Sequence, residues 1–399
     1  MSESKQGSFE FSLKWQSNSI KHLERKYFPV INCWRDFFPV SIGKKLDQLN
    51  PGESISETDE INSVIPAYNK NWRYKFIKRK INFEKAAEQG ITFRKGRFYP
   101  RSILSIVGFL LTDNRPFRVL ENEGDHLTID INHPLHSIPV AFSAKLIKEL
   151  PDREERGGNS RDIGSELTEG GPGLQLVLSE LETEFFLDSP FARENENPDL
   201  EFYSTPRLVN HVDLKAMENI SELYSRFVKP GMKVLDLMAG GNSHINEGIK
   251  DVKVTGLGMN TEELGKNNRL TENLIHDLNQ NPSIPSADNE FDMVVCTVSV
   301  EYLTQPVAVF KEVGRVLKPG SPFVLSFSDR WFPEKVVRIW TELHPFERLG
   351  LVTTYFKQSG LFSDLHTETV RGYPRPVSDS QYMVRRESDP IFAIWGYKK

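Results

Sequence analysis

The chain has 399 residues, of which 38% are hydrophobic and 26% charged, with a formal net charge of -5 and a pI near 6.1. This length predicts two domains, each large enough to bury its own core. The acidic balance excludes a general attraction to nucleic acid or to an anionic membrane, and we expect neither as a partner. The longest apolar run, 102–111, is much shorter than the roughly 20 residues of a bilayer span, and the polar start lacks a secretory pattern. These features predict a cytoplasmic protein.

Cysteine and histidine usage argues against a metal site or a disulfide framework. Cys33 and Cys296 fall in different predicted domains, so we expect both to be reduced. His126, His133 and His136 are the closest histidines, and they would converge only if a hairpin aligned them. We expect ordinary surface or turn histidines at these positions and no bound metal.

Three local features are predicted in the first part of the chain. Residues 1–33 are polar and irregular, and we expect an N-terminal extension there. Pro51 and Gly52 predict a turn on backbone grounds. Residues 68–88 carry many lysines and arginines among aromatics, which favours an amphipathic helix with a solvated basic face over an RNA or phosphate contact.

A β-like pattern follows over residues 93–150. Apolar side chains alternate at Leu127, Ile129 and Ile131, and again from Val140 to Leu146. Each set supplies one apolar face, which predicts a small antiparallel sheet. The apolar run 102–111 is interpreted as core, with an exposed binding surface as the alternative.

The string IDINHPLHSIPVAFSAKLIKEL, residues 129–150, resembles the end of the insert-in-flap region of SlyD-like FKBP-type peptidyl-prolyl isomerases. Its most specific part is Asn132-His133-Pro134-Leu135. The resemblance implies an α+β, mainly β, FKBP/SlyD-like domain over 34–150, acting as a substrate- or protein-binding module with possible affinity for unfolded peptides. The tyrosine and aspartate that line the family's prolyl pocket have no counterpart here, so we expect little isomerase activity.

Residues 151–201 are rich in glycine and charge and predict a linker. Beyond it, 202–399 alternates strand and helix signals. KVLDL (233–237) predicts a strand, and MAGGNSHINEGI predicts a glycine loop that leads into a helix. Further strands are expected at VKVTGL, at 291–296 and at PFVLSF, with a helix over 306–317. This order predicts an α/β doubly wound parallel sheet with its ligand at the carboxyl ends of the strands.

The same pieces in this order resemble the class I S-adenosylmethionine-dependent methyltransferases, especially the type 11 group. The resemblance rests on VLDL with its glycine loop, HDLN before SADNEFDMVV, FKEVGRVLKPGSPFVLSF, and IFAIWGYKK as an antiparallel last strand. It implies a Rossmann-like domain with S-adenosylmethionine as cofactor. The cofactor-binding residues that it implies are Asp236, Met238, Ala239, Gly240, Gly241, Gly258, Met259, Asn260, Asp277, Leu278 and Cys296.

Within this set the resemblance implies individual roles. Asp236 would orient the loop or meet the amino-acid part of the cofactor, and Gly240 would allow the closest backbone approach. Asp277 would accept a hydrogen bond from the adenine amino group, with Leu278 packed on the ring. Cys296 would lie where the fourth strand opens toward the methionine part.

The sequence departs from the family's pattern at two places. The first and third glycines of Gly-x-Gly-x-Gly fall at Met238 and Asn242. The acid that holds the ribose hydroxyls falls at Gly258, and Asn260 or Glu262 is the candidate substitute. A lost charge-assisted hydrogen bond of this kind is worth about 1.5–3 kcal/mol.

No general base is assigned, because a position on a helix surface or in packing explains His244 and Tyr302 better than catalysis does. Arg330, Trp331 and Phe332 are predicted to form part of the acceptor wall. The sequence predicts a methyltransferase for a small-molecule or protein acceptor, aided by its N-terminal module. The alternative is a non-catalytic, chaperone-like binding protein with a degenerate methyltransferase fold.

Overall fold

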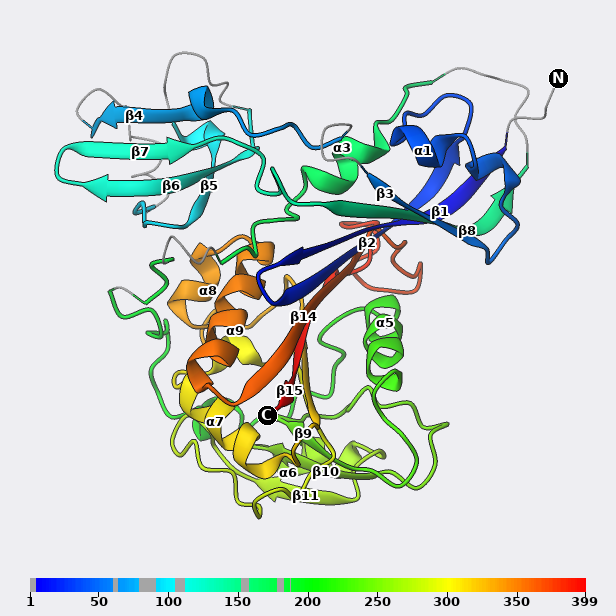
Figure 1. Ribbon diagram of the computed structural model, residues 1–399. Helices are drawn as coiled ribbons and strands as arrows, with labels where there is room; N and C mark the ends of the chain where they lie inside the picture. The colour runs from blue at the N-terminus through cyan, green and yellow to red at the C-terminus, as the bar shows by residue number, and fades with distance from the viewer. Residues whose placement is uncertain are drawn as a thin grey trace. The chain divides into compact units, whose positions relative to one another are not determined.

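The computed structural model describes residues 5–59, 64–78, 91–104, 112–151, 158–177, 183–186 and 188–399 (Figure 1). The chain divides into two compact units. The first comprises Met1–Asn18, His22–Asp188 and Glu342–Gly350, and the second comprises Ser19–Lys21, Ser189–Thr341 and Leu351–Lys399. Their main division, after Asp188, falls inside the predicted linker 151–201. Within the described ranges, no helix is both long and apolar enough to cross a membrane.

Long N-terminal strands build the larger sheet of the first unit. The strand order is β2-β1-β8-β3, with bounds β1 Gln6–Ser17, β2 Ile20–Asn32, β8 Val140–Leu150 and β3 Ser54–Asp59. Strand β8 pairs antiparallel with β1, from Val140 opposite Trp15 to Leu150 opposite Gln6, and antiparallel with β3. The expectation of an irregular extension over 1–33 is therefore wrong, because Gln6–Ser17 and Ile20–Asn32 form strands β1 and β2.

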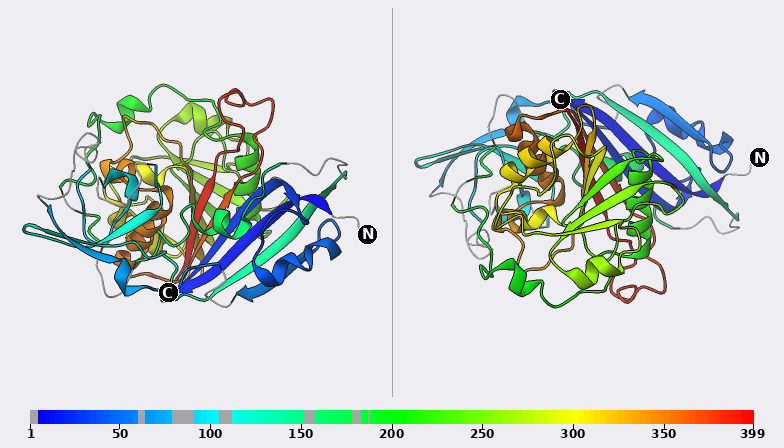
Figure 2. Two further views of the ribbon diagram at one scale, coloured as in Figure 1. Left: turned by 90° about the horizontal axis from the view of Figure 1, so that it is seen from above. Right: turned by 90° about the horizontal axis from the view of Figure 1, so that it is seen from below.

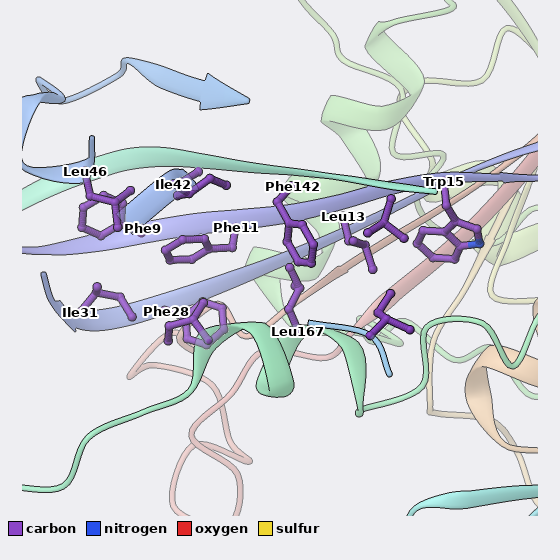
Figure 3. Close-up of a cluster of buried hydrophobic side chains, with 14 of the residues drawn as sticks. Phe9, Phe11, Leu13, Trp15, Phe28, Ile31, Ile42, Leu46, Phe142 and Leu167 are labelled. Carbon is purple, nitrogen blue, oxygen red and sulfur yellow. The ribbon is translucent and has the colours of Figure 1, made fainter. Parts of the chain in front are cut away.

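One face of β1 carries the core of this unit (Figure 3). Phe9, Phe11, Leu13 and Trp15 alternate along the strand and are at most 5% exposed. They pack with residues of β2, β8, the short helices α1 (Val40–Gly43) and η1 (Leu46–Gln48), and α3 (Ile163–Thr168). Leu167 of α3 is 1% exposed, so part of the predicted linker belongs to the core.

A second antiparallel sheet in the first unit has the order β4-β7-β6-β5. Its strands are β4 Arg73–Ile77, β7 His126–Asp130, β6 Pro116–Glu123 and β5 Phe98–Pro100, with one-turn 3-10 helices η2 Lys70–Trp72 and η4 Arg101–Ile103. Leu127 and Ile129 pack in its core, whereas Val140 and Phe142 pack on β1. The single small sheet predicted over 93–150 is corrected to parts of two sheets.

Two sequence predictions fall partly or wholly on residues that the structure does not describe. The basic helix expected over 68–88 is wrong for Arg73–Ile77, which is strand β4, while 79–90 lies outside the described residues. Most of the apolar run 102–111 also lies outside them, since the description stops at Leu104 and resumes at Thr112. Ile103 and Leu104 are each 1% exposed and belong to the core of the second sheet.

The second unit contains a mixed sheet of order β11-β10-β9-β12-β13-β15-β14. Its bounds are β9 Lys233–Leu237, β10 Lys253–Gly258, β11 Glu272–Ile275, β12 Met293–Thr297, β13 Pro322–Phe327, β14 Phe362–Arg371 and β15 Ile391–Lys398. The strands from β11 to β13 run parallel, and β15 is antiparallel to both of its neighbours. The predicted doubly wound sheet and its antiparallel last strand are confirmed.

Helices cover both faces of this sheet. Helix α5 (Leu214–Ser225) lies on one face, and α7 (Pro306–Val316) lies on the other (Figures 1 and 2). The remaining helices are α4 Asp199–Phe202, α6 Thr261–Lys266, η5 Val300–Tyr302, α8 Arg338–Glu342 and α9 Pro345–Ser359. The α5 side chains Ala216, Ile220 and Tyr224 pack fully buried on the sheet. This packing leaves the carboxyl ends of the parallel strands as the open edge.

Candidate active site

A cavity of about 510 Å³ lies at this open edge, entirely within the second unit. It is lined by residues that follow β9, β10, β11, β12 and β13, together with the segment 207–211. All the predicted cofactor-binding residues except Cys296 line it. Cys296 lies inside β12, is 1% exposed, and burial raises the pKa of its thiol well above its usual range. Its predicted place at the cofactor is therefore corrected to a place in the core.

Met238 stands where the glycine pattern has its first glycine, and it keeps a glycine-like backbone. Its φ is +58°, in the left-handed region that costs a side-chain-bearing residue about 1–2 kcal/mol. The turn after β9 is therefore preserved despite the substitution. Ala239 continues the turn by donating its N–H to the Leu257 carbonyl at 2.7 Å, which ties the loop to β10.

The helix predicted after the glycine loop does not form. The Asn242 side chain accepts the His244 N–H, and the Asn246 side chain accepts the Gly248 N–H, each at 2.8 Å. Such local side-chain bonds compete with helical ones, and His244 has a left-handed φ of +54°. The loop after β9 therefore presents no helix N-terminus to the cavity.

Asp236 on β9 is the most unusual group in the cavity wall. It is 2% exposed, and its Oδ2 has no hydrogen-bond partner among the described residues. Burial raises the pKa of Asp236 to about 7, although a hydrogen bond from Ser243 lowers it. Ser243 is itself held by Asn267, which donates to its Oγ and to the Gly240 carbonyl at 2.9 Å. A buried oxygen without a partner requires an explanation, and a donor group on a ligand in the cavity would supply one.

Gly258 ends β10 without room for a side chain. A β-carbon there would stand 2.4 Å from the carbonyl oxygen of Ala239 and 3.1 Å from Leu264. The family's acid therefore cannot be accommodated at this position without moving the glycine loop.

The two predicted substitutes for that acid have other partners. Asn260 caps α6, its Oδ1 accepting the N–H groups of Glu262 and Glu263, while its Nδ2 donates to the carbonyls of Tyr203 and Ser204. Glu262 is exposed, pairs with Lys266 at 3.2 Å, and is absent from the lining. Asn260 thus serves the local structure, and Glu262 is exposed and does not line the cavity.

Glu263, the next residue, is the lining carboxylate that the sequence analysis missed. Its Oε1 accepts the Arg207 N–H at 2.5 Å, and its Oε2 lies 3.5 Å from the position of a β-carbon on Gly240. The spacing Asn260-Thr-Glu-Glu263 is that of a capping box and predicts where α6 starts, but it does not tell which of the two glutamates faces the cavity.

Asp277 and Leu278 lie together beyond β11. The Asp277 Oδ1 accepts the N–H groups of Asn279 and Gln280, at 2.9 and 3.2 Å, which fixes the turn. Leu278 is 3% exposed and lines the cavity beside it. This pair offers one carboxylate and one apolar surface, which suits a flat ring that carries an amino group.

Aromatic side chains form another part of the cavity lining. Arg330, Trp331 and Phe332 all line the cavity, and their role on the acceptor side stays a prediction. The Phe332 ring contacts those of Tyr302 and His211, at centroid distances of 6.0 and 5.6 Å. Burial raises the pKa of Tyr302 well above its usual range, and its hydroxyl accepts the Phe332 N–H at 2.9 Å.

Of the two possible bases, Tyr302 is thus a neutral hydroxyl that positions Phe332. His244 also lines the cavity, and burial, then the nearby His211, lowers its pKa to about 4. Among the described residues, no three histidine, cysteine or acidic side chains are grouped so that they could hold a metal ion.

Comparisons with known proteins point to one family. Residues 239–325 match the family model described as "Methyltransferase domain". The chain is 31% identical over 157 residues to the "Ubiquinone/menaquinone biosynthesis C-methyltransferase UbiE" of Laribacter hongkongensis, spanning 37% of this chain and 63% of that protein. It is 34% identical over 167 residues to the protein of the same name from Chromobacterium violaceum, spanning 39% of this chain and 67% of that protein.

A solved structure with local likeness is the putative methyltransferase in complex with the Haloferax volcanii Trm112 methyltransferase activator. The identity is 17%, with 46% of this chain and 92% of that chain covered, and the TM-score is 0.34. The family-model match falls within the second unit. The resemblance of residues 129–150 to the FKBP-type isomerases stays a prediction.

Proposed function

This chain belongs to the S-adenosylmethionine-dependent methyltransferases, and from that premise we propose that its second unit methylates a small molecule bound in the cavity. S-adenosylmethionine is the cofactor, and when bound it supplies an electrophilic methyl group. The acceptor must approach that group in line, so the work of this chain is to hold and orient both molecules. No side chain is assigned as a general base.

The observation that carries the proposal is the buried Oδ2 of Asp236, which has no partner among the described residues and lies in the wall of the cavity. The cofactor's ammonium group would supply the donor that the Asp236 Oδ2 lacks, so the residues present fit this cofactor. Gly240 leaves space for a close approach, since a β-carbon there would meet only Glu263, at 3.5 Å. Asp277 and Leu278 would hold the adenine.

The acceptor side of the cavity favours a planar small molecule. Tyr302, Phe332 and Trp331 give it aromatic walls, and Arg330 adds a positive charge. The relatives are named C-methyltransferases of ubiquinone and menaquinone biosynthesis. We therefore place the acceptor atom on carbon, with a protein side chain as the less favoured acceptor.

The test is calorimetry of the full chain with S-adenosylmethionine and S-adenosylhomocysteine, followed by a transfer assay with a labelled methyl group on aromatic acceptors. Binding together with transfer supports the proposal. Binding of neither compound would favour the alternative, a non-catalytic binding protein with a degenerate methyltransferase fold.

For the first unit we propose a binding module that brings a substrate or an unfolded polypeptide. His133 and Pro134, from the stretch that resembles the FKBP-type family, line a separate cavity of about 280 Å³ with Trp72 and Arg101. Binding of a permanently unfolded polypeptide to the full chain, lost in Trp72→Ala, would support this role. A protease-coupled assay should show little prolyl isomerase activity.

A further inference from the structure

We infer that Glu263 is a cofactor-binding residue, and that its carboxylate accepts the ribose hydroxyls of S-adenosylmethionine from helix α6. This inference rests on the proposed function and adds to it a residue that replaces a strand-end carboxylate. Glu263 would hold the ligand through Oε2 while Oε1 holds the Arg207 N–H, which the structure shows at 2.5 Å.

The hydrogen-bond donors of S-adenosylmethionine determine which acceptors the cavity needs. S-adenosylmethionine offers three groups of hydrogen-bond donors, namely its ammonium, its two ribose hydroxyls and its adenine amino group. Three carboxylates appear among the described residues that line the cavity: Asp236, Glu263 and Asp277. Since donors left unpaired in a cavity are costly, each donor group needs an acceptor.

The positions of these carboxylates separate their roles. Asp236 lies under the glycine loop on β9, and Asp277 lies in the turn after β11 beside the apolar Leu278. Strand β10 stands between β9 and β11 in the sheet. Glu263, in the helix that follows β10, therefore stands between the ammonium end and the adenine end.

A side chain does not fit at the end of β10, so we assign the contact with the ribose hydroxyls to helix α6. A carboxylate on Gly258 would need its β-carbon 2.4 Å from the Ala239 carbonyl, so the strand end itself cannot supply it. Glu263 Oε2 instead lies toward Gly240, 3.5 Å from the β-carbon position of that glycine. A ligand hydroxyl against the Gly240 backbone is within reach of that oxygen.

Two contacts hold Glu263 in this position. Asn260 accepts the Glu263 N–H at 3.1 Å and so fixes the first turn of α6. Arg207 donates its N–H to Oε1, which orients the carboxylate and joins it to the segment 207–211 on the cavity wall. The oxygen that faces Gly240 is thus preorganised before a ligand arrives.

The test is a calorimetric cycle on the full chain with S-adenosylhomocysteine and an analogue in which both ribose hydroxyls are replaced by hydrogen. In Glu263→Gln the affinity for S-adenosylhomocysteine should fall about tenfold to a hundredfold, while affinity for the analogue stays that of wild type. The matched control is Glu262→Gln. The Glu262 side chain is exposed and does not line the cavity, so this change should leave both affinities unchanged.

Hydrogen exchange at the Arg207 amide separates a binding role from a structural one. Glutamine keeps an acceptor for that amide, so its protection should be unchanged in Glu263→Gln. Equal losses of affinity for both ligands, with faster exchange at Arg207, would show that Glu263 only shapes the wall, and would overturn the inference.

The inference and the proposed function fail in different ways. If wild type binds S-adenosylhomocysteine and Glu263→Gln binds it equally well, the assignment of Glu263 is wrong and the proposed function stands. If wild type binds neither ligand, the proposed function falls and the assignment falls with it.

Discussion

The carbonyl oxygen of Ala239 lies 2.4 Å from the place where a β-carbon on Gly258 would stand. Both residues line the cavity, and the Ala239 N–H also bonds to the Leu257 carbonyl. The glycine loop and the end of β10 are thus in backbone contact, and the glycine at 258 is required by that contact.

Gly258→Ala and Gly258→Asp should each destabilise the protein by about 1–3 kcal/mol, because any β-carbon there forces the loop to move. Urea unfolding measures the change. Gly241→Ala is the control, since a β-carbon on Gly241 meets nothing within 4 Å. A Gly258→Asp variant with wild-type stability and tighter cofactor binding would contradict this account.

The stability of the ligand-free protein should fall as pH rises from about 4 to 7, because of Asp236. Its pKa is raised from 3.8 to about 7 by burial, so between these values the folded state binds a proton that the unfolded state has released. The free energy of unfolding should fall by up to about 1.4 kcal/mol per pH unit in this range and level off above pH 7.

Asp236→Asn should remove this component of the pH profile, as measured by urea unfolding at several pH values. Bound S-adenosylhomocysteine should also reduce it in wild type, since its ammonium favours the ionised carboxylate. An identical pH profile in wild type and Asp236→Asn would show that Asp236 is not the group responsible.

Asp277 carries a structural and a binding role that two substitutions can separate. Asp277→Asn keeps an Oδ1 acceptor for the N–H groups of Asn279 and Gln280, whereas Asp277→Ala loses it. Both variants should bind S-adenosylhomocysteine less tightly in calorimetry, and Asp277→Ala should also be less stable. Unchanged affinity in both would remove Asp277 from the adenine site.

Asn260→Ala should cost about 1–2 kcal/mol, as expected for the loss of a helix N-cap. Asn260→Asp should recover most of that loss, because a carboxylate still accepts the N–H groups of Glu262 and Glu263. It cannot donate to the carbonyls of Tyr203 and Ser204, so a smaller deficit should remain. Thermal unfolding of the three proteins checks this order.

Leu167→Ala should lower the stability of the first unit by about 2–5 kcal/mol, since Leu167 is 1% exposed in its core. Leu200→Ala is the comparison, because Leu200 is 46% exposed and lies in the same predicted linker. Its effect should stay within about 0.5 kcal/mol. Similar effects of the two changes on the urea midpoint would argue against a core role for residues 163–168.

A site residue could be predicted from the sequence where its position depends only on the end of a parallel strand. β9, β10, β12 and β13 are short apolar runs bounded by turn residues, and parallel strands place their carboxyl ends at one edge. Asp236, Gly240 and Asp277 consequently meet in one cavity. Cys296 was misplaced because Met293–Cys296 are all buried, and a continuous apolar strand does not tell which of its residues is the first to reach the cavity.

Strands β1 and β4 were predicted wrongly, although the sequence of β1 carries a strand signal. Phe9, Phe11, Leu13 and Trp15 alternate with period two, the pattern of a strand with one buried face, yet polar residues between them suggested an irregular segment. The spacing of residues 68–88 predicted a helix, but Arg73–Ile77 pairs with β7 and forms a strand.

By itself, the sequence determined the order of strands β9, β10, β12, β13 and β15 and the presence of helix α7, because these follow from local apolar periods and turn chemistry, but the helix expected after β9 does not form. Tertiary structure alone decided which carboxylate faces the cavity beside Gly240. Glu262 and Glu263 are identical in composition and adjacent in the chain, and only the direction of α6 and the Arg207 N–H distinguish them. Side-chain direction in the first turn of a helix depends on where the helix starts and what packs on it.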